Sequence, residues 1–164
     1  MFTPELIAHA DRLIAALRTR GWMLATAESC TGGLIAALVT EIAGASDVFE
    51  RGFVTYSNAA KIGCLGVDYD LLRRHGAVSR EVALAMAAGA RRASAADIAV
   101  AVTGVAGPGG GTPEKPVGLV HIGLAALGKP AASREFHFGD PGRSAIRLAT
   151  VSEALKMIDE ALAA

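Results

Sequence analysis

The sequence has few of the residues on which several large classes of protein depend. It holds two cysteines, Cys30 and Cys64, which are too few for a disulfide scaffold or a cysteine-based zinc site. No His-x-x-x-His or His-Glu-x-x-His pattern occurs, so we expect no metal centre and no cofactor bound through one. Aromatic residues are sparse and form no base-stacking stripe, which argues against a nucleic-acid partner.

Charge and hydrophobic runs argue against two further classes. Acidic and basic residues number sixteen each, so the net charge does not favour nucleic acid or an anionic membrane surface as a partner. No apolar run approaches the ~18 residues of a membrane span, and the N-terminus lacks the basic start of a signal peptide. We therefore expect a soluble, cytoplasmic protein with one domain over residues 1–164.

Lysine is scarce as well, with four lysines against twelve arginines. Lysine loses its proton far more readily than arginine, so each lysine is a candidate for acid–base chemistry. Lys61 stands out because it closely follows a predicted strand and lies one helical turn after Ser57.

Hydrophobic periodicity and turn residues predict an alternation of helices and strands. The predicted strands cover 22–27, 51–56, 97–103, 117–126 and 133–138. The predicted helices cover 3–20, the segment from the turn at Ser29 to about 43, two short pieces within 59–76, 79–93, and the segment from 140 onward. This order indicates the α/β class, as a three-layer α/β/α sandwich with a mixed, mostly parallel sheet of about five strands.

Residues 26–33, Thr-Ala-Glu-Ser-Cys-Thr-Gly-Gly, form the most informative segment. They join a short apolar strand to an apolar helix, so they place a serine, a thiol and two glycines at a strand-to-helix turn. Unpaired N–H groups and the positive end of a helix dipole at such a turn can hold an anion or a developing oxyanion. The alternative is that these residues only cap the helix.

Two other loops also follow predicted strands. Residues 56–61, Tyr-Ser-Asn-Ala-Ala-Lys, leave the second strand and carry the amine of Lys61. Residues 103–112, Thr-Gly-Val-Ala-Gly-Pro-Gly-Gly-Gly-Thr, follow a buried strand and are neither a dinucleotide fingerprint nor a P-loop. Such a glycine-rich loop lets the backbone approach a ligand closely, or else is simply mobile. Because loops at strand ends build ligand sites in α/β sheets, we expect these segments to meet.

Ser29 is the candidate nucleophile, and Lys61 is its candidate base. No Gly-x-Ser-x-Gly elbow is present, and the four histidines lie in settings typical of structural or surface residues. A desolvated lysine can activate a serine, as in established Ser-Lys pairs. Lys61 could instead be a surface lysine that binds a phosphate or caps a helix. Cys30 is a rival nucleophile, although buried free cysteines are commonly inert.

Together the segments 27–33, 56–61 and 103–111, with Lys-Pro-Val-Gly at 115–118, resemble the C-terminal domain of the competence-damage-inducible protein CinA. They equally resemble its stand-alone relatives that act as nicotinamide-mononucleotide amidohydrolases. The resemblance runs from the first helix to the last and implies a three-layer α/β/α domain in stand-alone form. It also implies hydrolysis of the carboxamide of nicotinamide mononucleotide, a small-molecule nucleotide substrate, to nicotinic acid mononucleotide and ammonia, without a cofactor.

The resemblance assigns roles to residues of this sequence by motif. It implies catalytic roles for Ser29, Lys61, Thr103 and Tyr56, with Thr103 or Tyr56 passing a proton from Lys61. Substrate-binding roles are implied for Glu28, Cys30, Thr31, Gly32, Gly33, Asn58, Gly104, Gly107 and Arg143.

One departure from the family pattern concerns the arginine expected to face the substrate phosphate. Relatives usually carry Gly-Asp-Arg before the last helix, whereas residues 139–143 here read Gly-Asp-Pro-Gly-Arg. The phosphate ligand is then Arg143, displaced by the insertion, or Arg147, and we favour Arg143.

Two alternatives to nicotinamide-mononucleotide hydrolysis remain open from the sequence. One is a nucleotide-binding or regulatory module without turnover, and the other is a serine amidase acting on a different small amide. A homo-oligomer, with a dimer favoured, is a further expectation, because the alanine-rich helix over 79–93 could pack against a copy of itself.

Overall fold

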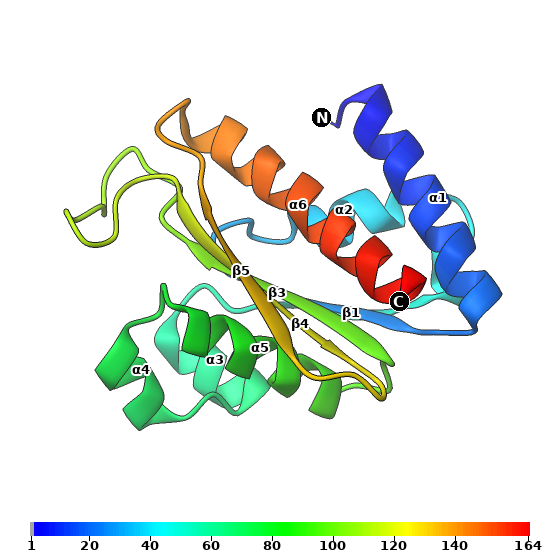
Figure 1. The fold of residues 1–164 in the computed structure, drawn as a ribbon, viewed down its shortest axis with the longest axis horizontal. Helices are drawn as coiled ribbons and strands as arrows, with labels where there is room; N and C mark the ends of the chain where they lie inside the picture. Colours follow the sequence, from blue (N-terminus) through cyan, green and yellow to red (C-terminus); the bar gives the residue numbers. More distant parts are fainter. Residues whose placement is uncertain (1) are drawn as a thin grey trace.

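A five-stranded β-sheet forms the middle layer of the structure, and helices cover both of its faces (Figure 1). The computed structural model describes residues 2–164. The strands are β1 Leu24–Glu28, β2 Phe49–Val54, β3 Ile98–Gly104, β4 Leu119–Ala126 and β5 Ala132–His137. The helices are α1 Pro4–Arg20, α2 Leu34–Thr40, α3 Asn58–Leu65, α4 Tyr69–His75, α5 Arg80–Arg92 and α6 Arg143–Ala163, with a short 3-10 helix η1 at Ala45–Asp47.

The strand order is β2-β1-β3-β4-β5. Strand β1 pairs in parallel with β2 and with β3, whereas β4 is antiparallel to both β3 and β5. Four strands therefore point one way, and β4 alone points the other. The predicted three-layer α/β class with a mixed, mostly parallel sheet is confirmed.

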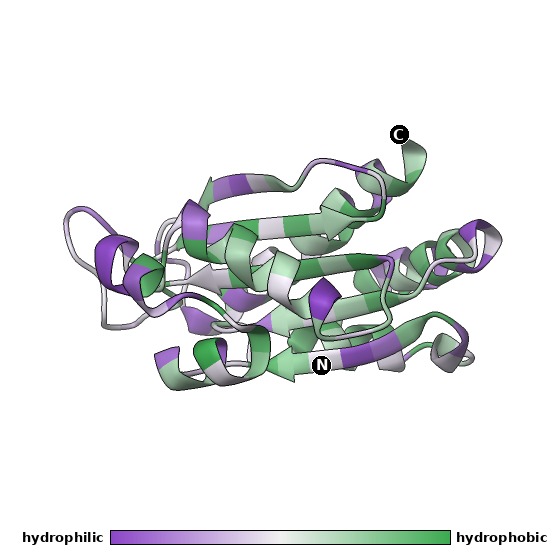
Figure 2. Ribbon diagram, turned by 90° about the horizontal axis from the view of Figure 1, so that it is seen from below, coloured by the Kyte–Doolittle hydropathy of each residue, from purple (hydrophilic) through white to green (hydrophobic). Residues whose placement is uncertain are grey.

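Two hydrophobic cores lie on the two faces of the sheet. Helices α1, α2 and α6 cover one face, and α3, α4 and α5 cover the other (Figure 1). Strand β3 serves both cores, because Val100 faces the α1 and α6 side while its neighbours Ala99 and Ala101 face α5. Apolar residues accordingly dominate the central strands β1, β3 and β4 (Figure 2), which is the pattern of strands buried on both faces, whereas the edge strands β2 and β5 carry polar residues.

The alanine-rich face of α5 packs against the sheet of its own chain. A side-chain carbon at Gly123 of β4 would lie 2.3 Å from the carbonyl oxygen of Ala83, which shows how closely helix and strand approach. Met86, Ala87 and Ala90 of α5 are fully buried there. The face from which we expected self-association is thus occupied within the chain, and its small residues serve the close contact of helix with sheet.

Several predicted boundaries are wrong by a few residues. Strand β2 covers Phe49–Val54 and therefore leaves Tyr56 in the following loop. Glu50 and Arg51 lie near the start of this edge strand, so the hydrophobic pattern did not indicate where the strand begins. Helix α2 ends at Thr40, and α6 begins at Arg143 because Gly142, with φ +96°, forms its N-cap.

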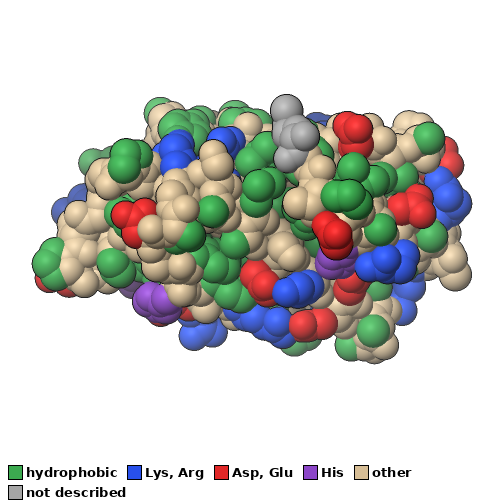
Figure 3. Space-filling view, turned by 90° about the horizontal axis from the view of Figure 1, so that it is seen from above, with side chains coloured by type: hydrophobic (Ala, Val, Ile, Leu, Met, Phe, Trp, Pro, Cys, Tyr) green, Lys and Arg blue, Asp and Glu red, His purple; other side chains and the backbone are tan. Residues whose placement is uncertain are grey.

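Charged side chains of both signs are interspersed on the face that carries α1 and α6 (Figure 3). Among residues 2–164, no helix combines the length and the apolar character that a membrane span requires.

Candidate active site

Three strand ends bring the predicted site together at one edge of the sheet. In the register of the parallel pairs, Glu28 at the end of β1 lies between Val54 of β2 and Val102 of β3. The chain leaves these strands into the Ser29 turn, the loop before Lys61 and the glycine-rich loop. The sheet topology therefore places segments that are far apart in sequence beside one another, as expected for strand-end loops.

Ser29 and Lys61 are in direct contact. The Nζ atom of Lys61 lies 3.0 Å from Ser29 Oγ and donates a second hydrogen bond, of 2.8 Å, to the carbonyl oxygen of Thr55. Helix α3 places the amine there, because the Ser57 hydroxyl caps its start by accepting from Ala60 N and Lys61 lies in its first turns. The distance is within the reach required of a base that takes a proton from a nucleophile.

Burial sets the electrostatics of Lys61. Its side chain is only 2% exposed, and within residues 2–164 no carboxylate forms an ion pair with it. Burial lowers the pKa of Lys61 from its ordinary value, opposed in part by the nearby Cys30 thiol. An amine that gives up its proton more easily is the form that can accept one from a serine hydroxyl.

The carboxylate of Glu28 fixes the Ser29 turn from the inside. Its Oε2 accepts hydrogen bonds from Thr31 Oγ1 at 2.6 Å, from Gly33 N at 3.1 Å and from Ile35 N at 3.0 Å, and its Oε1 accepts from Ala36 N at 2.9 Å. The side chain has no exposed surface through which a substrate could contact it. Glu28 therefore shapes the turn, whereas the sequence predicted that it would bind substrate.

These bonds also revise the expectation that the first N–H groups of α2 hold an oxyanion. The N–H groups of Gly33, Ile35 and Ala36 are used by Glu28, and that of Gly32 donates to the Ser29 carbonyl oxygen at 3.0 Å. In the described part of the chain, the N–H groups of Cys30 and Thr31 have no hydrogen-bond acceptor. The donors that stay available are thus in the turn itself, next to Ser29.

The two candidate arginines have different surroundings. Arg147, half-buried, donates from Nε to the Cys30 carbonyl oxygen at 3.2 Å and from Nη2 to the Thr31 carbonyl oxygen at 2.7 Å. Arg143 is exposed and donates to the Gly107 carbonyl oxygen at 2.7 Å and to Tyr56 Oη at 2.6 Å. Arg147 therefore holds the backbone of the nucleophile turn, and Arg143 joins the loops on the exposed side.

The predicted proton relays are engaged elsewhere. Thr103 is 1% exposed, and its hydroxyl donates to the Ala77 carbonyl oxygen at 2.8 Å. The Tyr56 hydroxyl, on a side chain that is 60% exposed, bonds to Arg143. Thr103 thus ties the end of β3 to the segment before α5, and neither hydroxyl hydrogen-bonds Lys61.

The remaining predicted residues line the same edge. Asn58 is exposed at the start of α3. Gly104 is required by packing, since a side-chain carbon there would lie 2.6 Å from Val120 Cγ2. Gly107 is buried with φ +72° and presents its carbonyl to Arg143.

Cys30 lies beside Ser29 in sequence but is a poor nucleophile. Its side chain is 6% exposed, and burial raises the pKa of its thiol to about 11. The reactive thiolate is therefore scarce near neutral pH.

Sequence reasoning missed the internal role of Glu28 and the backbone contacts of Arg147. One signal was available for each. Glu28 is the only acidic residue in β1, whose other residues are apolar or threonine, and it directly precedes a turn with unpaired N–H groups. Arg147 follows Arg143 by four residues, so both side chains project from the same face of α6.

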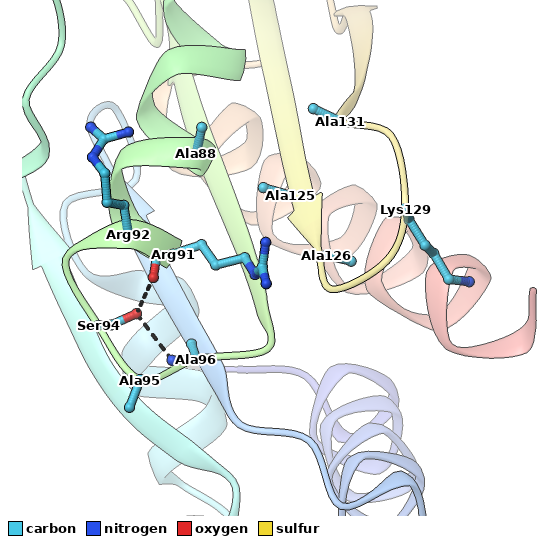
Figure 4. A pocket seen from close by; sticks show the side chains of 10 residues that line it. All are labelled: Ala88, Arg91, Arg92, Ser94, Ala95, Ala96, Ala125, Ala126, Lys129 and Ala131. Carbon is cyan, nitrogen blue, oxygen red and sulfur yellow. Dashed lines mark hydrogen bonds between the residues drawn. The ribbon is translucent and has the colours of Figure 1, made fainter.

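A recess of about 550 Å³ lies at the opposite end of the sheet from Ser29 (Figure 4). Its walls come from the end of α5, the loop before β3 and the β4–β5 hairpin. The Arg91 guanidinium points into it, whereas Arg92 and Lys129 point away, toward the carbonyl oxygens of Leu65 and Ala161. Arg91 and Arg92 lie in the last turn of α5, where cations offset the negative end of the helix dipole. The recess is therefore separate from the Ser29 site.

A sequence model of the family described as CinA C-terminal domain matches residues 7–162. A CinA-like protein from Anaeromyxobacter sp. (strain Fw109-5) is 51% identical over 150 residues, which are 92% of this chain and 36% of that protein. The nicotinamide-nucleotide amidohydrolase PncC of Escherichia coli (strain K12) is 47% identical over 159 residues, 96% of this chain and 95% of that protein. The chain thus spans about a third of the first relative and nearly all of the second.

Solved structures show the same fold. The competence/damage inducible protein CihA from Agrobacterium tumefaciens matches with a TM-score of 0.96 at 53% sequence identity, covering 100% of this chain and 99% of that one.

Proposed function

The chain belongs to the CinA C-terminal domain family, and from that premise we propose that it hydrolyses the carboxamide of nicotinamide mononucleotide with Ser29 as nucleophile and Lys61 as base. The products are nicotinic acid mononucleotide and ammonia. The contact of 3.0 Å between Lys61 Nζ and Ser29 Oγ carries the proposal. The name of the E. coli relative supports the choice of substrate.

The first half of the reaction forms an ester. Neutral Lys61 takes the hydroxyl proton of Ser29 while Oγ attacks the carboxamide carbon. The resulting tetrahedral intermediate breaks its C–N bond as protonated Lys61 returns the proton to the departing nitrogen, which leaves as ammonia. The nucleotide is then held as an acyl ester on Ser29.

The second half is hydrolysis of that ester. Lys61 is neutral again, and it takes a proton from water as the water oxygen attacks the ester carbon. The proton then passes to Ser29 Oγ as the ester bond breaks, and the acid that forms loses its remaining proton to solvent to give the carboxylate product. One amine thus serves both halves, as microscopic reversibility requires of a base that alternates with an acid.

The N–H groups of Cys30 and Thr31 are the proposed donors to the oxyanion of both intermediates. Within residues 2–164 neither donates to a protein acceptor, and both adjoin the nucleophile. A donor placed for the developing charge is worth about 3 kcal/mol of transition-state stabilisation.

Arg143 is the proposed ligand of the 5′-phosphate. Its side chain is exposed between Tyr56 and the glycine-rich loop, and a guanidinium binds phosphate oxygens in pairs. Arg147 is the weaker candidate, because it is half-buried and bonds two backbone carbonyls of the Ser29 turn, whereas Arg143 is exposed.

The test measures ammonia release by the purified chain from nicotinamide mononucleotide, nicotinamide riboside and nicotinamide. The proposal expects turnover of the mononucleotide and much lower kcat/KM for the two amides that lack phosphate. Binding of the mononucleotide by calorimetry without ammonia release would select a binding module instead. Equal turnover of all three amides would select a serine amidase without nucleotide specificity.

A further inference from the structure

The backbone of the Ser29 turn is held from two sides by charged side chains whose polar atoms bond the turn itself. Glu28 holds its N–H and hydroxyl groups, and Arg147 holds its carbonyls. Resting on the function proposed above, we propose that Glu28 and Arg147 are positioning residues that aim the Thr31 N–H group, one of the two proposed donors, at the oxyanion.

The peptide between Cys30 and Thr31 links Arg147 to the oxyanion donors. A trans peptide is planar, and its C=O and N–H bonds point in opposite directions. The Cys30 carbonyl and the Thr31 N–H belong to the same peptide, so the bond of 3.2 Å from Arg147 Nε to that carbonyl also sets the direction of the Thr31 N–H. The cation thus orients a donor that it does not touch.

The next peptide is held in the same way. Arg147 Nη2 bonds the Thr31 carbonyl at 2.7 Å, and the Gly32 N–H on the far side of that peptide donates to the Ser29 carbonyl at 3.0 Å. The Gly32 N–H is thereby removed from the set of free donors. Arg147 is anchored on α6, which packs across α1, α2 and the sheet, so its position is fixed by the core.

Glu28 holds the other side of the turn. Its fully buried carboxylate has no cation as partner in the described chain, and four hydrogen bonds to the turn and to α2 compensate its charge instead. The Thr31 side chain is one of those donors, so Thr31 is fixed by Glu28 through its hydroxyl and by Arg147 through its carbonyl. Glu28 and Arg147 therefore both hold Thr31, whose N–H group is a proposed oxyanion donor.

Two conservative variants separate this role from general stability. In Glu28→Gln, one carboxylate oxygen becomes an amide nitrogen that opposes a backbone N–H donor. In Arg147→Lys the charge stays, but an ammonium cannot reproduce the fork that bonds two successive carbonyls. Matched controls make the same chemical changes away from the site. Asp68→Asn changes the N-cap of α4, where the Asp68 carboxylate accepts from Leu71 N. Arg18→Lys changes a guanidinium that donates to the Gly44 carbonyl oxygen.

The experiment measures kcat and KM for nicotinamide mononucleotide and the amide hydrogen exchange of the Ser29 turn. We expect Glu28→Gln and Arg147→Lys to lower kcat on the order of 100-fold, because a small misplacement of catalytic groups costs about that much. KM stays close to that of the parent chain, and turn amides exchange faster. Asp68→Asn and Arg18→Lys leave kcat and turn exchange unchanged.

The outcomes distinguish the two proposals. If the parent chain is active and Glu28→Gln and Arg147→Lys keep the kcat of their controls, the positioning role is overturned and the proposed hydrolysis stands. A raised KM with unchanged kcat would also overturn it, since that result indicates direct substrate contact. If the parent chain itself releases no ammonia, the proposed function fails, and hydrogen exchange alone decides whether Glu28 and Arg147 hold the turn. Faster exchange of the turn amides in the two variants supports that role, and unchanged exchange contradicts it.

Discussion

The Nζ atom of Lys61 lies 3.0 Å from Ser29 Oγ, although the two residues are 32 positions apart in the chain. Ser29 follows β1, and Lys61 lies on α3 after β2, the parallel neighbour of β1. The contact is thus a product of strand pairing. It joins a hydroxyl to an amine whose pKa is lowered by burial, which is the requirement of a serine–lysine mechanism.

The rate should rise with pH through the pKa of Lys61, because only the neutral amine can accept the Ser29 proton. The pKa lies below the ordinary 10.5, since burial disfavours the charged form. A profile of kcat/KM against pH measures it as the pKa of the free enzyme. Lys61→Arg should be nearly inactive at every pH, because a guanidinium stays protonated. Activity that falls as pH rises toward that pKa would contradict the role.

The same pKa predicts a dependence of stability on pH. Between the lowered pKa of the folded state and 10.5, the unfolded chain binds more protons than the folded one. The Lys61 contribution to the free energy of unfolding therefore rises with pH across that window. The raised thiol pKa of Cys30 acts in the opposite direction there, so the comparison is made in a Cys30→Ala background. Lys61→Met fills a similar volume without the charge and should remove the rise in denaturant titrations at a series of pH values. A slope unchanged in this variant would show that Lys61 is not its source.

Cys30 should be dispensable for catalysis. With a thiol pKa of about 11, roughly one thiol in a thousand is ionised at pH 8. Cys30→Ala should retain kcat within a few-fold, the cost of lost packing beside Ser29. Alkylation at pH 8 followed by peptide mapping should label the exposed Cys64 much faster than Cys30. Preferential labelling of Cys30 with loss of activity would identify it as the nucleophile instead.

Arg143 should act through the phosphate and not through the chemistry. We expect Arg143→Ala to raise KM for nicotinamide mononucleotide by about 10-fold to 100-fold, the usual value of a charged hydrogen bond. Its effect on nicotinamide riboside should be small, because that amide has no phosphate. Tyr56→Phe, which removes the hydroxyl that accepts from Arg143, should have a weaker effect in the same direction. Equal losses on both amides would place Arg143 elsewhere in the mechanism.

Gly89 on α5 should be essential for the placement of α3, the helix that carries Lys61. A side-chain carbon at Gly89 would lie 2.1 Å from the carbonyl oxygen of Leu65, at the end of α3. Gly89→Ala should therefore destabilise the fold by about 1–3 kcal/mol, as overpacking does, and should lower kcat by shifting the amine.

Gly63→Ala is the matched control for Gly89→Ala. Among the described residues, and apart from its chain neighbours and the backbone of its own helix, no atom lies within 4 Å of the carbon that it adds on α3. The substitution should be neutral or stabilise the helix by up to ~1 kcal/mol. Denaturant unfolding of both variants measures the difference, and equal stability of the two would contradict the proposed close contact.

The sequence predicted the layers and the meeting of the three loops because those features depend on short-range patterns. Apolar runs identified the strands, and parallel strands necessarily bring their carboxyl ends to one edge of a sheet. Strand β2 was placed two residues late because its first residues include Glu50 and Arg51, which an edge strand tolerates but the hydrophobic pattern does not register.

What the sequence could not predict is the use of individual polar groups. Glu28, Thr103 and Arg147 were each close to the site, but their hydrogen-bond partners depend on tertiary geometry. The carboxylate of Glu28 turns inward to α2, and Thr103 bonds Ala77 across the gap to the segment before α5. Motif position alone does not tell a residue that contacts a substrate from one that holds the residue beside it.

Rapid acid quenching of the parent chain with nicotinamide mononucleotide during the first turnover, followed by peptide mass mapping, shows directly which residue carries the acyl group. We expect an acyl ester of the nucleotide on Ser29, formed as ammonia is released, and neither ester nor ammonia release from Ser29→Ala. Full turnover by Ser29→Ala, or an acyl adduct on Cys30 in place of Ser29, would contradict this expectation.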